Sequence, residues 1–251
     1  MPFDSMPPHL SPHHDNRPFF DGNPKMIFLF GVVLGIALTL VFGQLLGVTG
    51  GASTGTGTTT ATTTGTPTTK PTTATGKLAA VTSADHVRGD IKKAKVVMIE
   101  YADYQCPYCG THHPTMLDLM TKYGKDVVWV YRHFPLTSIH PNARPSALAA
   151  ECVNEQSADK FWQFTDAMFA NQAKLSSDYY KEVAQSLGLD MTKFNNCVST
   201  EKYASVVDAD TASGQAAGVT GTPATFVNGQ LVSGAVPEAT FVTLIDGLLK
   251  K

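Results

Sequence analysis

Apolar runs and segments of helical period alternate along the last two thirds of the chain. The β-branched run AKVVMIEYAD (94–103) predicts a buried strand, and DVVWVYRHFPL (126–136) predicts a second one. Between them, residues 107–124 space their apolar side chains as a helix does. Pro107 suits the first turn, where its missing N–H leaves no bond unmade. Strand, helix and strand at this spacing predict a βαβ unit with parallel strands.

The pattern after this unit changes to helices and then returns to strands. Apolar residues recur at helical spacing over 142–217. GVTGTPATFVNGQLVSGAV (218–236) predicts a hairpin that turns at Asn228–Gly229, and a last helix follows from Pro237. We therefore predict one α/β domain over 78–251, with a helical insertion at about 138–217.

The first 77 residues show no such folding pattern. Residues 1–25 are rich in Pro and lack an apolar period, which predicts a disordered tail. Residues 26–48 carry no charge and are long enough to cross a bilayer. They also exceed a signal-peptide core of about 7–15 residues, so we predict an uncleaved transmembrane anchor. Residues 49–77 are rich in Thr and poor in apolar side chains, which predicts a disordered linker.

Charge distribution predicts the orientation of this anchor. Arg17 and Lys25 precede the span, and the next basic residue is Lys70. The positive-inside rule then places the N-terminus in the cytoplasm and residues 78–251 outside the plasma membrane. The net charge of −2 gives no reason to expect nucleic acid as a partner.

All four cysteines lie in the predicted domain, outside the cytoplasm, where disulfides can form. Cys106 and Cys109 form a Cys-x-x-Cys pair at the end of the first predicted strand, where open α/β sheets hold their chemistry. The N–H groups and dipole of the helix that starts there favour a thiolate. We expect Cys106 to be an exposed nucleophile and Cys109, one turn into the helix, to resolve a mixed disulfide.

Glu100 stands inside the apolar strand that precedes the pair. Burying a carboxylate is costly, and burial raises its pKa. Glu100 could then accept and return a proton as Cys109 cycles between thiol and disulfide. The alternative is an edge position with Glu100 in solvent.

Three segments carry a resemblance to a known family. EYADYQCPYC, YRHFPLTSIHPNARPSALAAE and GVTGTPATFVNG together resemble DsbA-type thiol–disulfide oxidoreductases, especially the membrane-tethered ones, over about 84–250. The resemblance implies a thioredoxin fold, with Cys106 as nucleophile, Cys109 as resolving thiol and Glu100 as the buried acid. It also implies that Pro223 is a cis-proline facing the pair. The backbone of Thr222 would then be free to pair with an extended substrate segment.

The same resemblance implies a dithiol oxidase that needs no cofactor and forms disulfides in exported Cys-containing proteins. A DsbB-like or vitamin-K-epoxide-reductase-like membrane partner would reoxidise it. Isomerases of this fold are usually dimers with a dedicated dimerisation domain, and residues 78–93 are too short for one. We therefore rank an oxidase first and expect a monomer. The dipeptide Pro107–Tyr108 differs from that of strongly oxidising DsbA proteins, which often carry His at the second position. Pro-Tyr is also the glutaredoxin dipeptide. A function as disulfide reductase or isomerase therefore remains the alternative.

Cys152 and Cys197 both fall in the helical insertion, and we interpret them as a structural disulfide. A zinc centre of all four cysteines, or of the Cys-x-x-Cys pair with His112 or His113, is a rival hypothesis. We interpret these two histidines as solvent-exposed helix residues and predict no metal. A binding module without catalysis is a third alternative.

Overall fold

The computed structural model describes residues 72–73 and 76–251. The predicted tail (1–25), membrane span (26–48) and most of the predicted linker (49–77) lie outside these residues, and their assignments stay predictions. Among the helices of residues 76–251, none combines the length and apolar character needed to cross a membrane.

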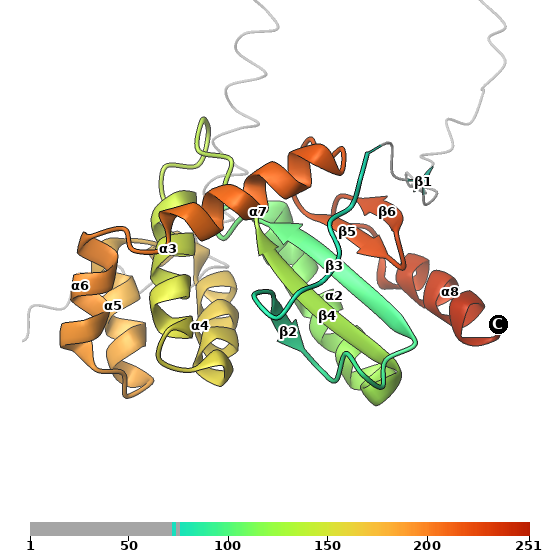
Figure 1. Ribbon diagram of the computed structural model, residues 1–251, viewed down its shortest axis with the longest axis horizontal. Helices are drawn as coiled ribbons and strands as arrows, with labels where there is room; N and C mark the ends of the chain where they lie inside the picture. Colours follow the sequence, from blue (N-terminus) through green and yellow to red (C-terminus); the bar gives the residue numbers. More distant parts are fainter. Residues whose placement is uncertain (1–71, 74–75) are drawn as a thin grey trace, which may run out of the picture. The chain divides into compact units, whose positions relative to one another are not determined.

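A mixed sheet of six strands forms the centre, in the order β1-β6-β5-β3-β4-β2 (Figure 1). The strands are β1 Thr72–Thr73, β2 His86–Arg88, β3 Val96–Ala102, β4 Val127–His133, β5 Ala224–Val227 and β6 Gln230–Ser233. β3 and β4 pair in parallel, whereas the other neighbours are antiparallel. The predicted βαβ unit and hairpin are therefore confirmed. Asn228 and Gly229 both have positive φ, as a tight hairpin turn requires.

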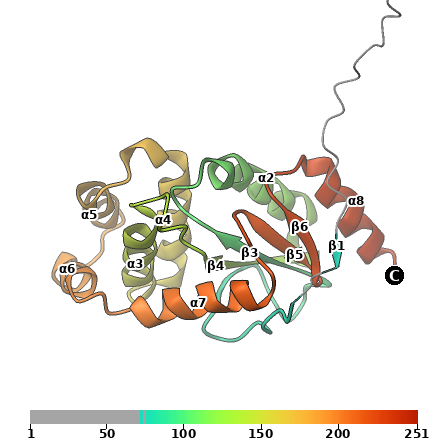
Figure 2. The same ribbon diagram turned by 90° about the horizontal axis from the view of Figure 1, so that it is seen from above.

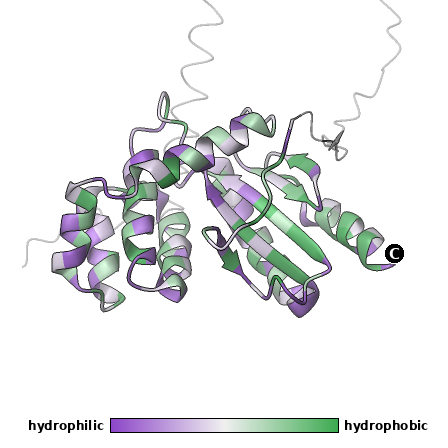
Figure 3. Ribbon diagram, in the orientation of Figure 1, coloured by the Kyte–Doolittle hydropathy of each residue, from purple (hydrophilic) through white to green (hydrophobic). Residues whose placement is uncertain are grey.

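Helices cover both faces of this sheet (Figure 2). α2 (Pro107–Tyr123) and α8 (Glu238–Leu249) lie on one face, and α7 (Ala204–Ala216) lies on the other. The side chains of β3 alternate accordingly, because successive residues of a strand point to opposite faces. Val96 and Met98 join the core under α2, whereas Ile99 and Tyr101 join the core under α7. Figure 3 shows that apolar residues concentrate in these central strands.

Four more helices gather beside the sheet, where the helical insertion was predicted (Figure 1). They are α3 Ala143–Asn154, α4 Ala158–Ala170, α5 Ser177–Ser186 and α6 Met191–Ser199. The side chains of Ser157, Ser176 and Asp190 accept N–H bonds at the starts of α4, α5 and α6. Cys152 in α3 and Cys197 in α6 are joined by a disulfide with Cα atoms 5.8 Å apart. The insertion thus has caps and a crosslink of its own.

The sequence pattern predicted no strand before residue 94, yet two strands lie there. β2 pairs with β4 at one edge of the sheet, with His86 opposite Tyr131. β1 pairs with β6 at the other edge, with Thr72 opposite Leu231. β1 falls within the segment predicted to be a disordered linker, so the end of that segment belongs to the sheet. Runs of two or three residues are too short for a period-two pattern to be recognised.

Removing the Cys152–Cys197 disulfide should destabilise the domain. The sequence separation of 45 residues corresponds to about 4 kcal/mol of chain entropy as an upper bound. We expect Cys152→Ala/Cys197→Ala to lower the free energy of unfolding by about 2–4 kcal/mol in urea titrations. Cys106→Ala/Cys109→Ala is the matched control and should keep the stability that this crosslink provides. Equal stability of the parent and Cys152→Ala/Cys197→Ala would contradict a stabilising crosslink.

Candidate active site

Cys106 caps the N-terminus of α2, directly beyond the end of β3. Its N–H donates to the carbonyl of Asp103 at 3.1 Å, and its carbonyl accepts from Gly110 N–H at 3.1 Å. Pro107 occupies the first turn, as predicted. The expectation of an exposed nucleophile was wrong, because Cys106 is only 3% exposed. Neighbouring Tyr108 is 68% exposed instead and forms the accessible surface of the motif.

The two cysteines of the motif are unjoined thiols with opposite electrostatic environments. The pKa of Cys106 is lowered to about 5, chiefly because the Cys109 thiol donates a hydrogen bond to its sulfur. Burial opposes this shift, and the backbone N–H groups of Tyr108 and Cys109 add to it. Burial raises the pKa of Cys109 well above its ordinary value. At neutral pH the pair is therefore a Cys106 thiolate beside a Cys109 thiol.

Glu100 is buried in β3 rather than exposed at an edge. Burial raises the pKa of Glu100 to about 8, and the nearby Trp129 side chain opposes part of the shift. No hydrogen bond joins the two, since Glu100 Oε2 and Trp129 Nε1 are both buried without partners among the described residues. The charge of Glu100 also raises the pKa of Cys109, so the two groups lie close enough to interact. A carboxyl group that titrates near neutrality there can exchange a proton with the Cys109 thiol.

The loop before β5 closes over the Cys106 sulfur. The Thr222–Pro223 peptide bond is cis. The Cys106 Sγ lies 3.4 Å from the carbonyl oxygen of Thr222, to which Cys106 can donate only in its protonated thiol form. No backbone hydrogen bond within residues 76–251 uses the Thr222 N–H. The loop therefore covers the nucleophile and leaves a main-chain donor for an incoming segment.

Sequence reasoning missed the side chains that hold the segment between β3 and α2, residues 103–106. Gln172, in the helical insertion, donates to the carbonyls of Tyr104 and Cys106, both at 2.8 Å. A Cβ at Gly110 would stand 2.2 Å from Gln172 Oε1, so this approach requires glycine. Buried Asp103 accepts the backbone N–H of Gln105 at 2.7 Å, as turn-forming aspartates do. Asp103 could have been found as a turn signal, whereas Gln172 is too distant in sequence to give one.

The interpretation of His112 and His113 as exposed was wrong. Both are buried on α2, where His112 Nε2 lies 3.2 Å from Thr225 Oγ1 and His113 Nε2 lies 2.9 Å from Asp166 Oδ1. Burial lowers the pKa of His112 to about 4, so this imidazole is neutral at neutral pH. Thr225 is the cross-strand partner of Glu100. His112 thus lines the same buried space as the carboxyl group.

The four-cysteine zinc hypothesis is contradicted. Cys152 and Cys197 are already joined to each other. His112 and His113 do not gather with the cysteine pair either. In the described part of the chain, the His/Cys/Asp/Glu atoms that converge within 4.8 Å belong to His86, His133 and Glu151.

Comparisons with solved structures place this fold in a class. DsbA2 of Pseudomonas aeruginosa is 28% identical, with a TM-score of 0.57 over 68% of this chain and 98% of that one. Oxidised BdbD of Bacillus subtilis is 21% identical, with a TM-score of 0.63 over 72% of this chain and 100% of that one. The fold is that of a thioredoxin-like domain, and its structural matches include DsbA-type thiol–disulfide oxidoreductases.

The family assignment rests on the sequence match. Residues 81–247 match the thioredoxin family model, and the chain belongs to that family. Among curated relatives, the Na⁺/H⁺ antiporter NhaA 3 of Salinispora tropica is 39% identical over 146 residues, 58% of this chain. NhaA 1 of a Mycobacterium species is 34% identical over 165 residues, 64% of this chain. The chain spans only 22% and 26% of the lengths of these two relatives.

The hydrogen bond from Cys109 should set the acidity of Cys106. We expect thiolate absorbance to titrate with a pKa of about 5 in the reduced chain. Cys109→Ala removes the donor and should raise this pKa toward the ordinary value of about 8.5. Cys109→Ser is the matched control, because its hydroxyl can still donate, and should raise the pKa less. An unchanged pKa in Cys109→Ala would exclude the hydrogen bond as the cause.

Burial of Glu100 should make stability fall as pH rises. Its folded pKa of about 8 lies above its ordinary value of 4.5, so the folded chain binds the extra proton between these values. In a Cys106→Ser background, which removes the opposite trend of the thiolate, Glu100 should make unfolding easier by roughly 3–5 kcal/mol between pH 5 and pH 8, relative to the same background with Glu100→Gln. Urea titrations of the two variants measure this difference, and an equal pH dependence in both would place Glu100 in contact with solvent.

Proposed function

We propose that this chain is a protein dithiol oxidase that introduces disulfides into exported proteins through Cys106 and Cys109. The observation that carries the proposal is the opposite shift of the two thiol pKa values. A stabilised Cys106 thiolate favours the reduced pair, and a favoured reduced pair makes the disulfide form an oxidant. The buried Glu100 and the cis-proline loop support the same chemistry.

The reaction transfers two electrons from a substrate dithiol to the enzyme disulfide. A substrate thiolate attacks the Cys106 sulfur, which breaks the Cys106–Cys109 bond and forms a mixed disulfide. Cys109 leaves as a thiolate and takes a proton, which the neutral Glu100 carboxyl can donate. A second substrate thiolate then attacks the substrate sulfur of the mixed disulfide. The substrate disulfide forms, and Cys106 is released as a stable thiolate.

An extended substrate segment would dock beside the cis-proline loop. The unused Thr222 N–H can donate to the substrate backbone, in the manner of strand addition. Exposed Tyr108 offers an aromatic surface next to the reacting sulfur. Recognition through the main chain depends little on the substrate's side chains. Its low sequence specificity suits an enzyme that acts on many proteins.

The proposal includes a place for the enzyme and a partner. Residues 26–48 would anchor the chain in the plasma membrane, with the domain outside the cytoplasm. The Cys152–Cys197 disulfide supports an oxidising compartment. A DsbB-like or vitamin-K-epoxide-reductase-like membrane protein would then return the pair to the disulfide. Reduction or isomerisation by the same pair is the alternative, which the Pro107–Tyr108 dipeptide keeps open.

The reduction potential of the pair decides between these directions. The Cys106 pKa of about 5 lies between the values of about 7 for thioredoxin and about 3.5 for DsbA. The potentials of those proteins are about −270 and −120 mV, so equilibration with glutathione should give a value above about −200 mV. A value near −270 mV would make the chain a reductant.

Activity is checked with a reduced, unfolded substrate protein. The oxidised chain should form substrate disulfides, and Cys106→Ser should not. Cys152→Ala/Cys197→Ala, assayed below its melting temperature, is the matched control and should keep exchange activity. Full activity of Cys106→Ser would favour a module that works without the pair.

A further inference from the structure

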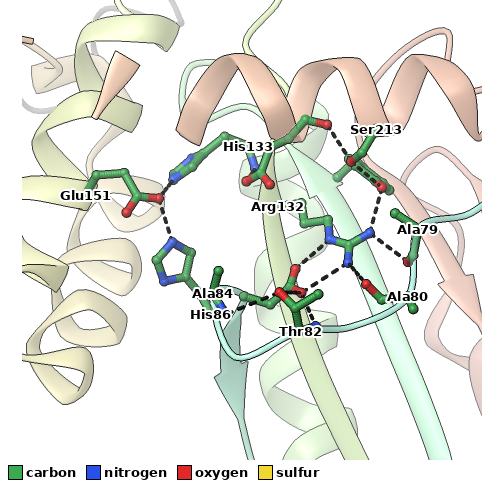
Figure 4. A network of polar contacts seen from close by, with 12 residues as sticks. Ala79, Ala80, Thr82, Ala84, His86, Arg132, His133, Glu151 and Ser213 are labelled. Carbon is green, nitrogen blue, oxygen red and sulfur yellow. Dashed lines mark hydrogen bonds and ion pairs between the residues drawn. The ribbon is translucent and has the colours of Figure 1, made fainter. Parts of the chain in front are cut away.

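Two histidines and a glutamate from three separate elements converge outside the cysteine site (Figure 4). His86 comes from β2, His133 from the end of β4, and Glu151 from α3. The Nε2 atoms of His86 and His133 lie 2.6 and 2.9 Å from the same oxygen, Glu151 Oε1. All three residues are buried. Their potential ligand atoms lie within 4.8 Å of one another.

The negative charge at this cluster has no permanent cation beside it. Among the ion pairs of residues 76–251, none joins Lys or Arg to Glu151 or to Asp210. Asp210 accepts the backbone N–H of His133 at 2.9 Å and interacts electrostatically with Glu151. Arg132, which directly precedes His133 in β4, pairs with Asp85 instead. The partners of the Glu151 carboxylate are instead the two imidazoles, which are cations only when protonated.

The histidine rings are held in place by aromatic packing. Phe161 stacks on His86 with centroids 3.7 Å apart and ring planes 13° apart. Tyr131 and Tyr104 pack against His133, with centroid distances of 5.3 and 5.9 Å. An apolar shell around fixed imidazoles is the environment in which metal ligands are oriented and water is controlled.

The cluster also has a route to solvent. A hollow of about 600 Å³ lies beside β2 and α4, and His86 forms part of its wall. Asp85 and Trp162 line the same hollow. The hollow therefore brings solvent to the His86 side of the cluster.

We propose that His86, His133 and Glu151 bind a divalent transition-metal ion such as Zn²⁺. The three provide two imidazole nitrogens and a carboxylate oxygen, a donor set typical of Zn²⁺ and other late first-row ions rather than of Ca²⁺ or Mg²⁺. Tetrahedral bonds of about 2.0–2.2 Å would hold ligand atoms roughly 3.3 Å apart. The contacts of 2.6 and 2.9 Å need only a small opening to admit the ion. A water from the hollow can complete the coordination.

This site goes beyond the proposed oxidase and does not depend on it. The ion would neutralise the Glu151 carboxylate and crosslink β2, β4 and α3. A bound Zn²⁺ would stabilise the attachment of β2 and α3 to β4. It would not take part in electron transfer, since Zn²⁺ has no redox chemistry.

Co²⁺ binding to the full chain tests the site, in a Cys106→Ser/Cys109→Ser background that removes competing thiol ligands. We expect one equivalent of Co²⁺ with visible d–d absorption, displaced by Zn²⁺, and a melting temperature that rises with Zn²⁺ concentration. Glu151→Gln and His86→Gln should each weaken binding at least tenfold. His13→Ala/His14→Ala is the matched control, which removes two histidines elsewhere, and should leave that binding unchanged.

Two results would overturn the proposal. One is no Co²⁺ binding by the parent at millimolar metal, and the other is unchanged affinity in Glu151→Gln and His86→Gln. If these variants fail to fold, Cu²⁺ is added to the parent that carries His13→Ala/His14→Ala. Its electron paramagnetic resonance spectrum should show hyperfine coupling to two imidazole nitrogens. Coupling to one or none would reject the site.

Discussion

The parallel pairing of β3 with β4 is the constraint on which the rest of the domain depends. Its register runs from Val96 opposite Val127 to Ala102 opposite His133, so both strands end together. The chain leaves the end of β3 and enters α2 within a few residues. Cys106 therefore lies at a helix start, beside the carboxyl ends of β3 and β4. A slip of one residue would turn Glu100 away from α2 and separate it from Cys109. The chemistry of the pair therefore rests on strand register.

The face of the sheet under α2 encloses polar groups in an otherwise apolar core. Glu100, Cys109 and His112 are all buried there, and Glu100 Oε2 and His112 Nδ1 lack hydrogen-bond partners among the described residues. Such groups reduce stability, and their ionisation is shifted toward the neutral form by burial. Neutral Glu100, neutral His112 and a protonated Cys109 leave Cys106 as the group that carries charge. The negative charge thus collects on the sulfur that faces the cis-proline loop.

Local patterns in the sequence predicted the elements, whereas contacts between distant segments could not be predicted. β3, α2, the β5–β6 hairpin and the helical insertion follow from periodicity and turn residues. The burial of His112 could also have been predicted from the sequence. His112 recurs at helical spacing with Cys109, Met116 and Leu119, which places all four on one face of α2. β2 is too short for a pattern. Gln172 meets the active-site loop only through the tertiary fold, so the sequence gives no signal for its role.

Residues 79–88 show how a segment without a core of its own is held on the sheet. β2 has three residues, and a ladder this short holds an edge strand weakly. Arg132 and His133 are adjacent in β4 and therefore point to opposite faces. Arg132 binds Asp85 and the carbonyls of Ala79 and Ala80 on one side, and His133 meets His86 through Glu151 on the other (Figure 4). Two polar clusters on opposite faces of one strand thus add to the packing of Val81 and Val87 against the core. This is why the segment is ordered although its sequence predicts no element there.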